Sequence, residues 1–285
     1  MKQSRILGLL CLFLLFSLVV NGVYAQQKVV KILAIGNSFS EDAVEQYLHE
    51  LADAEGISTI IGNMYIAGCS LERHVKNARE NAPAYAYRKI SVDGTKEERK
   101  NVSLEAALAD EDWDYVSLQQ ASPFSGMYET YEASLPELVE YVKKRLPQKT
   151  KLMLHQTWAY ASDATHTGFK NYNRDQLTMY RSIVDAVNKA SKLSKIKIII
   201  PTGTAIQNAR TSSVGDHMNR DGYHLDLMIG RYTAACTWFE QIFKRNIVGN
   251  PYYPQGMDDK QREIAQRAAH TAVTHPNRIT ELKIE

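Results

Sequence analysis

Two short polar segments far apart in the chain carry the residue types that acyl-transfer chemistry needs. Ser38 follows the apolar run 29–35 and precedes a stretch with helical character, so its hydroxyl is expected at a strand-to-helix turn. The N–H groups at the start of a helix carry partial positive charge, which suits a nucleophile that generates an oxyanion. Asp221 and His224 stand three residues apart near the other end of the chain. Together these residues predict a hydrolase with a Ser-His-Asp triad.

Each of these residues also has a simpler interpretation. Ser38 and Glu41 match the S-x-x-E capping box, in which the serine only caps a helix. Asp221 followed by glycine is typical of a turn, and His224 alone fits a surface histidine. His217 is a second candidate base, but the aspartate beside it lacks the three-residue spacing. The order of the motifs favours Ser38 as the nucleophile, His224 as its base and Asp221 as the partner of that base.

The rest of the chain alternates between apolar runs and amphipathic stretches, which is typical of strands separated by helices. The expected strands are 29–35, 59–66, 115–119, 151–156 and 196–201. The expected helices are 41–54, 71–80, 131–145, 174–193, 227–244 and 258–275. This order predicts an α/β fold, a three-layer α/β/α sandwich with a flavodoxin-like parallel sheet of about five strands. Residues 83–101 break the pattern and are expected to form a hairpin or a mobile flap.

Polar residues follow the expected strands, and in an open parallel sheet such loops meet at one edge. In chain order they are Gly36, Asn37, Ser38, Gly68, Gln119, Gln120, Ser122 and Trp158. We expect Asn37, Ser122 and Trp158 to contact the substrate, with Trp158 stacking on a sugar ring. The alternative for Trp158 is that it packs inside the protein, as aromatic side chains near loops more often do.

With these motifs in order, the chain resembles the SGNH (GDSL-like) hydrolases, and most closely an exported bacterial branch of largely uncharacterised substrate. That family has a Gly-Asp-Ser motif after its first strand, and here Gly36-Asn37-Ser38 matches with Asn37 in place of the aspartate. Its second motif is a glycine after the second strand, matched by Gly68, and its last is Asp-x-x-His, matched by 221–224. The third motif of the family is not matched, because the family has Gly-x-Asn-Asp where this chain has Leu118-Gln119-Gln120.

The resemblance implies a serine esterase that needs no cofactor and acts on O-acyl or O-acetyl groups of a carbohydrate. It implies that the N–H groups of Ser38 and Gly68 bind the oxyanion together with a side-chain amide from Gln119 or Gln120. Alternation along a strand should send only one of the two glutamines into the cleft, and Gln119 is the preferred one. The alternative is that both glutamines bond neighbouring loops.

The first 25 residues have the pattern of a signal peptide. Lys2 and Arg5 form a basic start, residues 6–20 are almost wholly apolar, and small residues end at Ala25. We therefore expect export to the periplasm or the medium without a membrane anchor, and a single α/β domain over 26–285. Loss of Lys2 and Arg5 takes the count of lysine plus arginine from 34 to 32, which equals the 32 acids, so nucleic acid is not an expected partner.

No metal site is expected, because the chain has no HExxH and no CxxC motif. Cys69 and Cys236 remain after cleavage, and they either pair or stay as buried thiols. The expected partner is a small-molecule or glycan ester, and the sequence leaves the oligomeric state open. Two functional alternatives also stay open: a glycan-binding protein that has lost catalysis, and an acyltransferase that passes the acyl group to a sugar hydroxyl.

Overall fold

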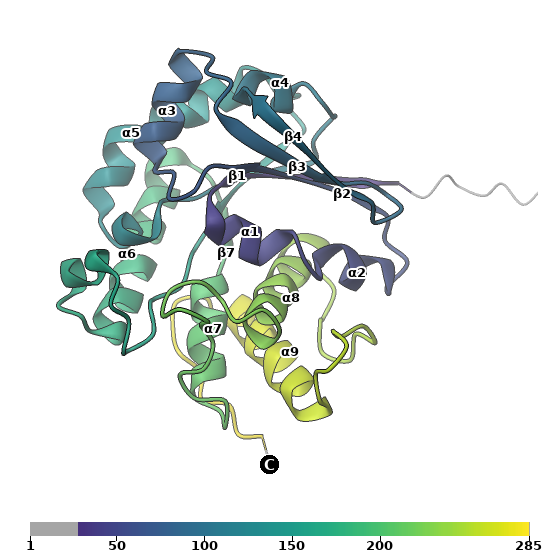
Figure 1. The fold of residues 1–285 in the computed structure, drawn as a ribbon, viewed down its shortest axis with the longest axis vertical. Coiled ribbons are helices and arrows are strands. Elements are labelled where there is room, and N and C mark those ends of the chain that lie inside the picture. Colours follow the sequence, from purple (N-terminus) through teal and green to yellow (C-terminus); the bar gives the residue numbers. More distant parts are fainter. Residues whose placement is uncertain (1–27, 285) are drawn as a thin grey trace, which may run out of the picture.

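Residues 28–284 are described here from a computed structural model of the chain. A seven-stranded sheet forms its centre, in the order β4-β3-β2-β1-β5-β6-β7 (Figure 1). The strands are β1 Val30–Gly36, β2 Thr59–Tyr65, β3 Tyr85–Ile90, β4 Lys96–Val102, β5 Tyr115–Leu118, β6 Lys151–His155 and β7 Ile198–Ile200. The strands β2, β1, β5, β6 and β7 are parallel and have the expected flavodoxin-like order.

The sheet is larger than the expected five strands because 83–101 forms a hairpin rather than a flap. Strand β3 pairs antiparallel with β2, and β4 pairs antiparallel with β3. Strand β4 reads Lys-Glu-Glu-Arg-Lys-Asn-Val and is exposed along nearly its whole length. It therefore lacks the apolar pattern by which a strand is recognised, and its charges suit an edge strand that must not pair with another chain.

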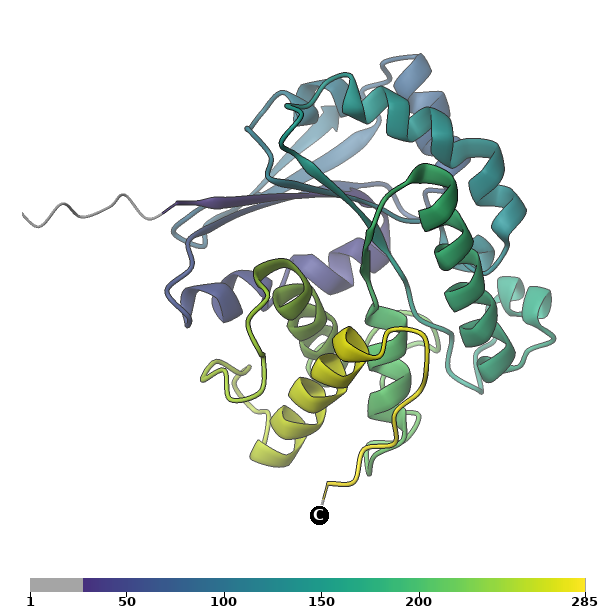
Figure 2. The ribbon, with the colours of Figure 1, turned by 180° about the vertical axis from the view of Figure 1, so that it is seen from behind.

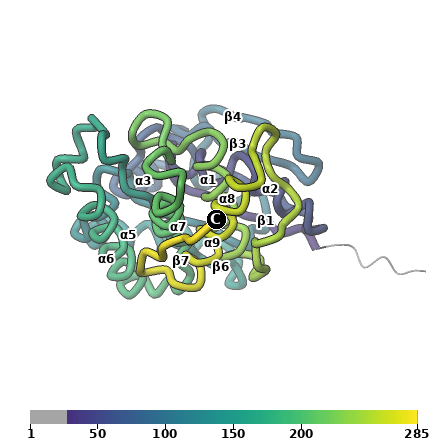
Figure 3. Tube along the Cα trace, turned by 90° about the horizontal axis from the view of Figure 1, so that it is seen from below, coloured from purple at the N-terminus to yellow at the C-terminus, as the bar shows by residue number. Residues whose placement is uncertain are grey.

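Helices cover both faces of the sheet (Figures 1 and 2). One face carries α1 Ser38–Val44, α2 Leu48–Asp53, α7 Thr202–Arg210, α8 Ile229–Phe243 and α9 Asp259–Thr274. The other face carries α3 Leu71–Arg79, α4 Leu104–Leu108, α5 Tyr128–Lys143 and α6 Gln176–Ser194, and two short 3-10 turns lie at Ser122–Phe124 and Thr167–Tyr172. From below, α7, α8 and α9 lie in front of the sheet (Figure 3). The three-layer α/β/α prediction is confirmed.

One helix prediction was wrong in its extent, and two helices, α4 and α7, were not predicted. The single helix expected over 41–54 is split into α1 and α2, because Tyr47 has φ +71° and its hydroxyl donates to the Leu227 carbonyl at 2.8 Å. Every residue of α7 is buried, including the polar Gln207 and Asn208, so the helix lacks the contrast between an apolar and a solvent-exposed polar face that marks a surface helix.

The predicted signal peptide, residues 1–25, lies outside the described residues, so cleavage and export stay predictions. Within residues 28–284, no helix is both long enough and apolar enough to cross a bilayer. Cys69 and Cys236 do not pair: both are buried free thiols, and burial raises the pKa of Cys69 to about 12, with only a small opposing effect from Arg73.

Candidate active site

Ser38 follows strand β1, which pairs with β2 on one side and with β5 on the other. The strand order of the sheet reverses between these two neighbours of β1. The carboxyl edge of the sheet at such a point is where ligands bind in open α/β folds. Gly36 ends the strand in a space that admits no side chain, since an added Cβ would lie 2.5 Å from Ser40 Oγ and 2.8 Å from Gln119 Cδ. The sharp turn that presents Ser38 therefore depends on this glycine.

Asn37, and not Ser38, caps helix α1. Asn37 has extended backbone angles, and its Oδ1 accepts from the Phe39 N–H at 2.9 Å. Ser38 is the first residue of the helix, and its Oγ bonds to His224. The capping-box interpretation of Ser38 was wrong, because a neighbouring side chain already performs that role.

The structure brings Ser38, His224 and Asp221 together in one hydrogen-bonded chain. His224 Nε2 lies 2.9 Å from Ser38 Oγ, and His224 Nδ1 lies 2.7 Å from Asp221 Oδ2. The other Asp221 oxygen accepts from the backbone N–H of His224 at 2.8 Å and of Tyr223 at 3.2 Å. His217 is exposed and makes no hydrogen bond within residues 28–284. The three-residue spacing thus selects the histidine that contacts the serine.

The electrostatics of Asp221 favour one tautomer of His224. Partial burial acts to raise the pKa of Asp221, but hydrogen bonds from the side chain and backbone of His224 outweigh it and hold that pKa below its ordinary value. Asp221 is therefore a carboxylate at neutral pH and accepts the proton on His224 Nδ1. The lone pair of Nε2 then faces the Ser38 hydroxyl, which is the arrangement in which an imidazole can accept a serine proton.

The backbone N–H groups of Ser38 and Gly68, which the sequence analysis expects to bind an oxyanion, make no hydrogen bond within residues 28–284. Gly68 is exposed with φ +60°, in a turn closed by a bond from the Cys69 N–H to the Ile66 carbonyl at 3.1 Å. Asn37 Nδ2 donates to the Cys69 carbonyl at 3.0 Å and so ties this turn to the start of α1.

Both glutamine side chains form hydrogen bonds to neighbouring parts of the protein. Gln119 Nε2 donates to Asn37 Oδ1 at 2.8 Å, while its Oε1 lies 2.7 Å from Nδ1 of the buried His155. Gln120 Nε2 donates to Thr130 at 3.0 Å, and its Oε1 accepts from the backbone N–H groups of Leu71 and Ala121 at 2.9 and 2.8 Å. Both side chains are only 2% exposed. The alternative interpretation, that both glutamines bond neighbouring loops, describes what is observed.

The three expected substrate contacts are buried instead. Trp158 is fully buried and stacks on Phe39, with ring centroids 4.2 Å apart, and its Nε1–H donates to the Tyr223 carbonyl at 2.8 Å. Asn37 is 1% exposed and serves the helix cap, while Ser122 Oγ lies 2.8 Å from the Tyr160 hydroxyl. Trp158 therefore packs inside the protein and cannot stack on a sugar ring in this conformation.

His166 is a site residue that the sequence analysis missed. Its partly exposed ring lies 4.9 Å from the ring of Tyr223, which in turn lies 4.2 Å from the ring of His224. His166 Nδ1 accepts from the Gly168 N–H at 3.0 Å. Desolvation and the nearby His224 lower the pKa of His166, against an opposing effect of Asp221. Nothing in its local sequence marks this loop histidine, because only the fold brings it to the triad.

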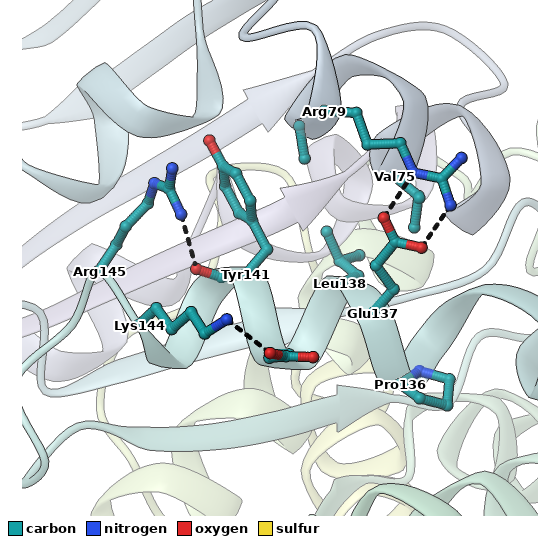
Figure 4. A pocket seen from close by; sticks show the side chains of 10 residues that line it. Val75, Arg79, Pro136, Glu137, Leu138, Tyr141, Lys144 and Arg145 are labelled. Carbon is teal, nitrogen blue, oxygen red and sulfur yellow. Dashed lines mark hydrogen bonds and ion pairs between the residues drawn. The ribbon is translucent and has the colours of Figure 1, made fainter.

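A separate hollow of about 570 Å³ lies between α3 and α5 (Figure 4). Arg79 and Glu137 form an ion pair at its edge, and Lys144 pairs with Glu140. None of the triad residues lines this hollow, so it is distinct from the candidate active site. Within residues 28–284, no three histidine, cysteine or acidic side chains are grouped to hold a metal ion.

Comparison with known proteins places this chain in a family. Residues 31–272 match the model of DUF4886, a domain of unknown function. A DUF4886 protein from Bacteroides uniformis ATCC 8492 is 66% identical, with a TM-score of 0.89, over 90% of this chain and 98% of that one. A protein from Slackia heliotrinireducens, assigned by inference to the SGNH hydrolases, is 21% identical, with a TM-score of 0.53, over 75% of this chain and all of that one.

The second similarity concerns the fold alone, and a comparison with curated proteins gave no match. The resemblance to SGNH hydrolases is confirmed at the level of that fold. The chain belongs to the DUF4886 family and has the α/β/α fold of the SGNH hydrolases.

Proposed function

We propose that this protein is a serine esterase in which Ser38 is the nucleophile, His224 the general base and Asp221 the partner that orients the imidazole. The observation that carries the proposal is the unbroken hydrogen-bond chain from Asp221 through His224 to Ser38. A serine hydroxyl is a poor nucleophile unless a positioned base removes its proton, and this chain supplies that base.

In the proposed reaction, Ser38 Oγ attacks the ester carbonyl carbon as His224 Nε2 takes the hydroxyl proton. The negative charge that develops on the carbonyl oxygen is bound by the free N–H groups of Ser38, at the start of α1, and of Gly68, in the turn after β2. The tetrahedral intermediate collapses, the C–O bond to the alcohol breaks, and His224 returns the proton to that alcohol. Water, deprotonated by His224, then attacks the acyl carbon. The bond between that carbon and Ser38 Oγ breaks, the acid leaves, and His224 returns the proton to Ser38.

The substrate class proposed is an O-acyl or O-acetyl ester of a carbohydrate. This part follows from the family resemblance and the expected export, and not from the lining of the site. Partly exposed rings of Tyr223 and His166 beside His224 offer surfaces suited to a sugar.

The test is hydrolysis of a short-chain aryl ester by the wild type, Ser38→Ala, His224→Ala and His217→Ala. Removal of Ser38 or His224 should lower turnover by about a thousandfold or more, while His217→Ala, which removes an exposed histidine nearby in sequence, should leave turnover unchanged. Full turnover in Ser38→Ala would refute the proposal. A wild type that neither hydrolyses the ester nor reacts with a serine-directed phosphonate would instead favour a non-catalytic glycan-binding protein.

A further inference from the structure

We infer that Asp42 is a positioning residue, whose buried carboxylate holds the loop with Asp221 and His224 against the helix that carries Ser38. Asp42 lies one helical turn after Ser38 on α1 and is completely buried. For its effect on catalysis the inference rests on the proposed esterase function, whereas its effect on the loop can be measured independently.

The Asp42 carboxylate accepts hydrogen bonds from three directions. Leu225 donates its backbone N–H to Oδ2 at 2.8 Å, and Arg220 Nη1 lies 3.0 and 3.2 Å from the two oxygens. Arg231, on α8, places Nε at 2.8 Å and Nη2 at 2.6 Å from Oδ1. One side chain on α1 is therefore bonded to the catalytic loop and to a second helix at once.

The two loop contacts of Asp42 lie on either side of the candidate catalytic pair. Arg220 directly precedes Asp221, and Leu225 directly follows His224. The segment is also closed on itself, because the Arg220 N–H donates to the His224 carbonyl at 3.0 Å. A carboxylate that is hydrogen-bonded to both ends of such a closed segment fixes the position of its middle residues, and therefore the position of the His224 imidazole relative to Ser38.

Stability alone is a weak explanation for this arrangement. Burying a carboxylate carries a large desolvation cost, and buried ion pairs often contribute no more than well-packed apolar residues would. A position that must be held to a fraction of an ångström is different, because misplacing a catalytic group by about 1 Å can cost a hundredfold in rate. Directional bonds from Arg220, Arg231 and the Leu225 N–H fix the loop in a way that apolar packing does not.

Glu45 offers a matched control at the other end of the same helix. It is 5% exposed and accepts from Asn63 Nδ2 at 2.7 Å and from Arg88 Nη1 at 3.2 Å, and it also pairs with Lys96. These partners join α1 to the neighbouring strands of the sheet. No residue of 220–226 bonds to Glu45 within the described chain, so its loss should affect stability without moving His224.

The experiment compares Asp42→Asn, Arg220→Gln and Glu45→Gln with the wild type. Steady-state kinetics on an aryl ester give kcat and KM, and amide hydrogen exchange reports on residues 220–226. Asp42→Asn should lower kcat about a hundredfold with KM changed less than about threefold, and Arg220→Gln about tenfold. Both should speed exchange in 220–226, whereas Glu45→Gln should keep kcat within about threefold and leave exchange there unchanged.

Arg220→Gln keeps the Asp42–Arg231 pair, so it provides a result if Asp42→Asn does not fold. The inference is overturned if both variants keep wild-type exchange in 220–226 and wild-type kcat, or if Glu45→Gln matches them in both. A wild type without esterase activity would refute the proposed function. In that case, faster exchange confined to 220–226 would still support the role of Asp42 in holding the loop, and unchanged exchange would refute that role too.

Discussion

The Asn37 side chain allows a test of how the turn at residues 66–69, which contains Gly68, is tied to α1. Aspartate is the usual residue of the Gly-Asp-Ser motif at this position. Asn37 is 1% exposed, accepts from Phe39 and Gln119, and donates to the Cys69 carbonyl at 3.0 Å. In Asn37→Asp the two accepting contacts can persist. The donated bond cannot, because an ionised carboxylate has no proton to give.

The magnitude follows from those contacts. The buried Cys69 carbonyl loses its bond from Asn37, at a cost of about 1–3 kcal/mol, and a buried carboxylate now faces that oxygen. We expect Asn37→Asp to lower the free energy of unfolding at pH 7 by about 3 kcal/mol. For a domain of this size that corresponds to a fall in Tm of about 6–12 °C. Turnover should fall as well, by up to about a hundredfold, because the turn with Gly68 is no longer tied to α1.

The loss of stability in Asn37→Asp should depend on pH in a defined direction. Burial and the facing carbonyl should raise the folded-state pKa of the new aspartate above its unfolded value of about 3.9. Between those two pKa values the folded state binds more protons than the unfolded state, so the stability deficit grows as pH rises and shrinks as pH falls. Below the folded-state pKa the carboxyl of the folded protein is protonated and can donate to the Cys69 carbonyl again.

The assay is urea unfolding of wild type and Asn37→Asp from pH 5 to 8, with turnover measured on the same samples. Taking the difference between the two proteins at each pH removes the titration of every other group. The reasoning fails if Asn37→Asp equals the wild type in stability and turnover across this range. It also fails if the deficit is the same at every pH, because a lost bond without a titrating group would then be sufficient.

Three further outcomes are expected. Gln119→Ala and Gln120→Ala should each lower kcat about tenfold with little change in KM, because Gln119 bonds to Asn37 and Gln120 accepts from the Leu71 N–H, close in sequence to the turn at 66–69. Wild-type kcat in both variants would show that neither amide supports that turn. Gly68→Ala has room for its Cβ but must keep φ near +60°, so it should cost about 1–2 kcal/mol in unfolding free energy, and an unchanged urea midpoint would contradict this. Complete burial lowers the pKa of His155 to about 3, so below about pH 6.5 the unfolded state binds a proton that the folded state does not, and the free energy of unfolding decreases as the pH is lowered. Urea unfolding should show that His155→Gln abolishes about 2 kcal/mol of the loss between pH 7 and pH 5.

Local patterns were sufficient to predict the parts of the molecule that depend on a few neighbouring residues. The apolar run before Ser38 predicted a strand-to-helix turn, and the spacing of Asp221 and His224 singled out the histidine that the fold brings to Ser38. Ile198-Ile199-Ile200 was recognisable because strands buried on both faces are often continuously apolar, and apolar runs between helical stretches marked the other parallel strands. In these places the local signal and the final environment agree.

The wrong predictions concern residues whose partners lie far away in the sequence. Trp158 was placed at the substrate because it follows a strand, but its packing against Phe39 has no signature in either segment. Gln119 and Gln120 follow β5, which ends at Leu118, so strand alternation no longer governs where their side chains point. Asp42 gave no signal at all, because its partners Arg220 and Arg231 lie 178 and 189 residues further along the chain.

The distance along the chain between the two halves of the candidate active site has a consequence for how the protein folds. The Ser38–His224 contact joins positions 186 residues apart, and the bonds from Asp42 span similar separations. Contacts of such long range form slowly because they close large loops, and chains are synthesised from the N-terminus. The nucleophile's turn can therefore exist for a period without its base, and the site is completed only when the segment after α7 has docked. Esterase turnover, if the proposed function holds, would then report the completion of folding rather than the formation of the sheet.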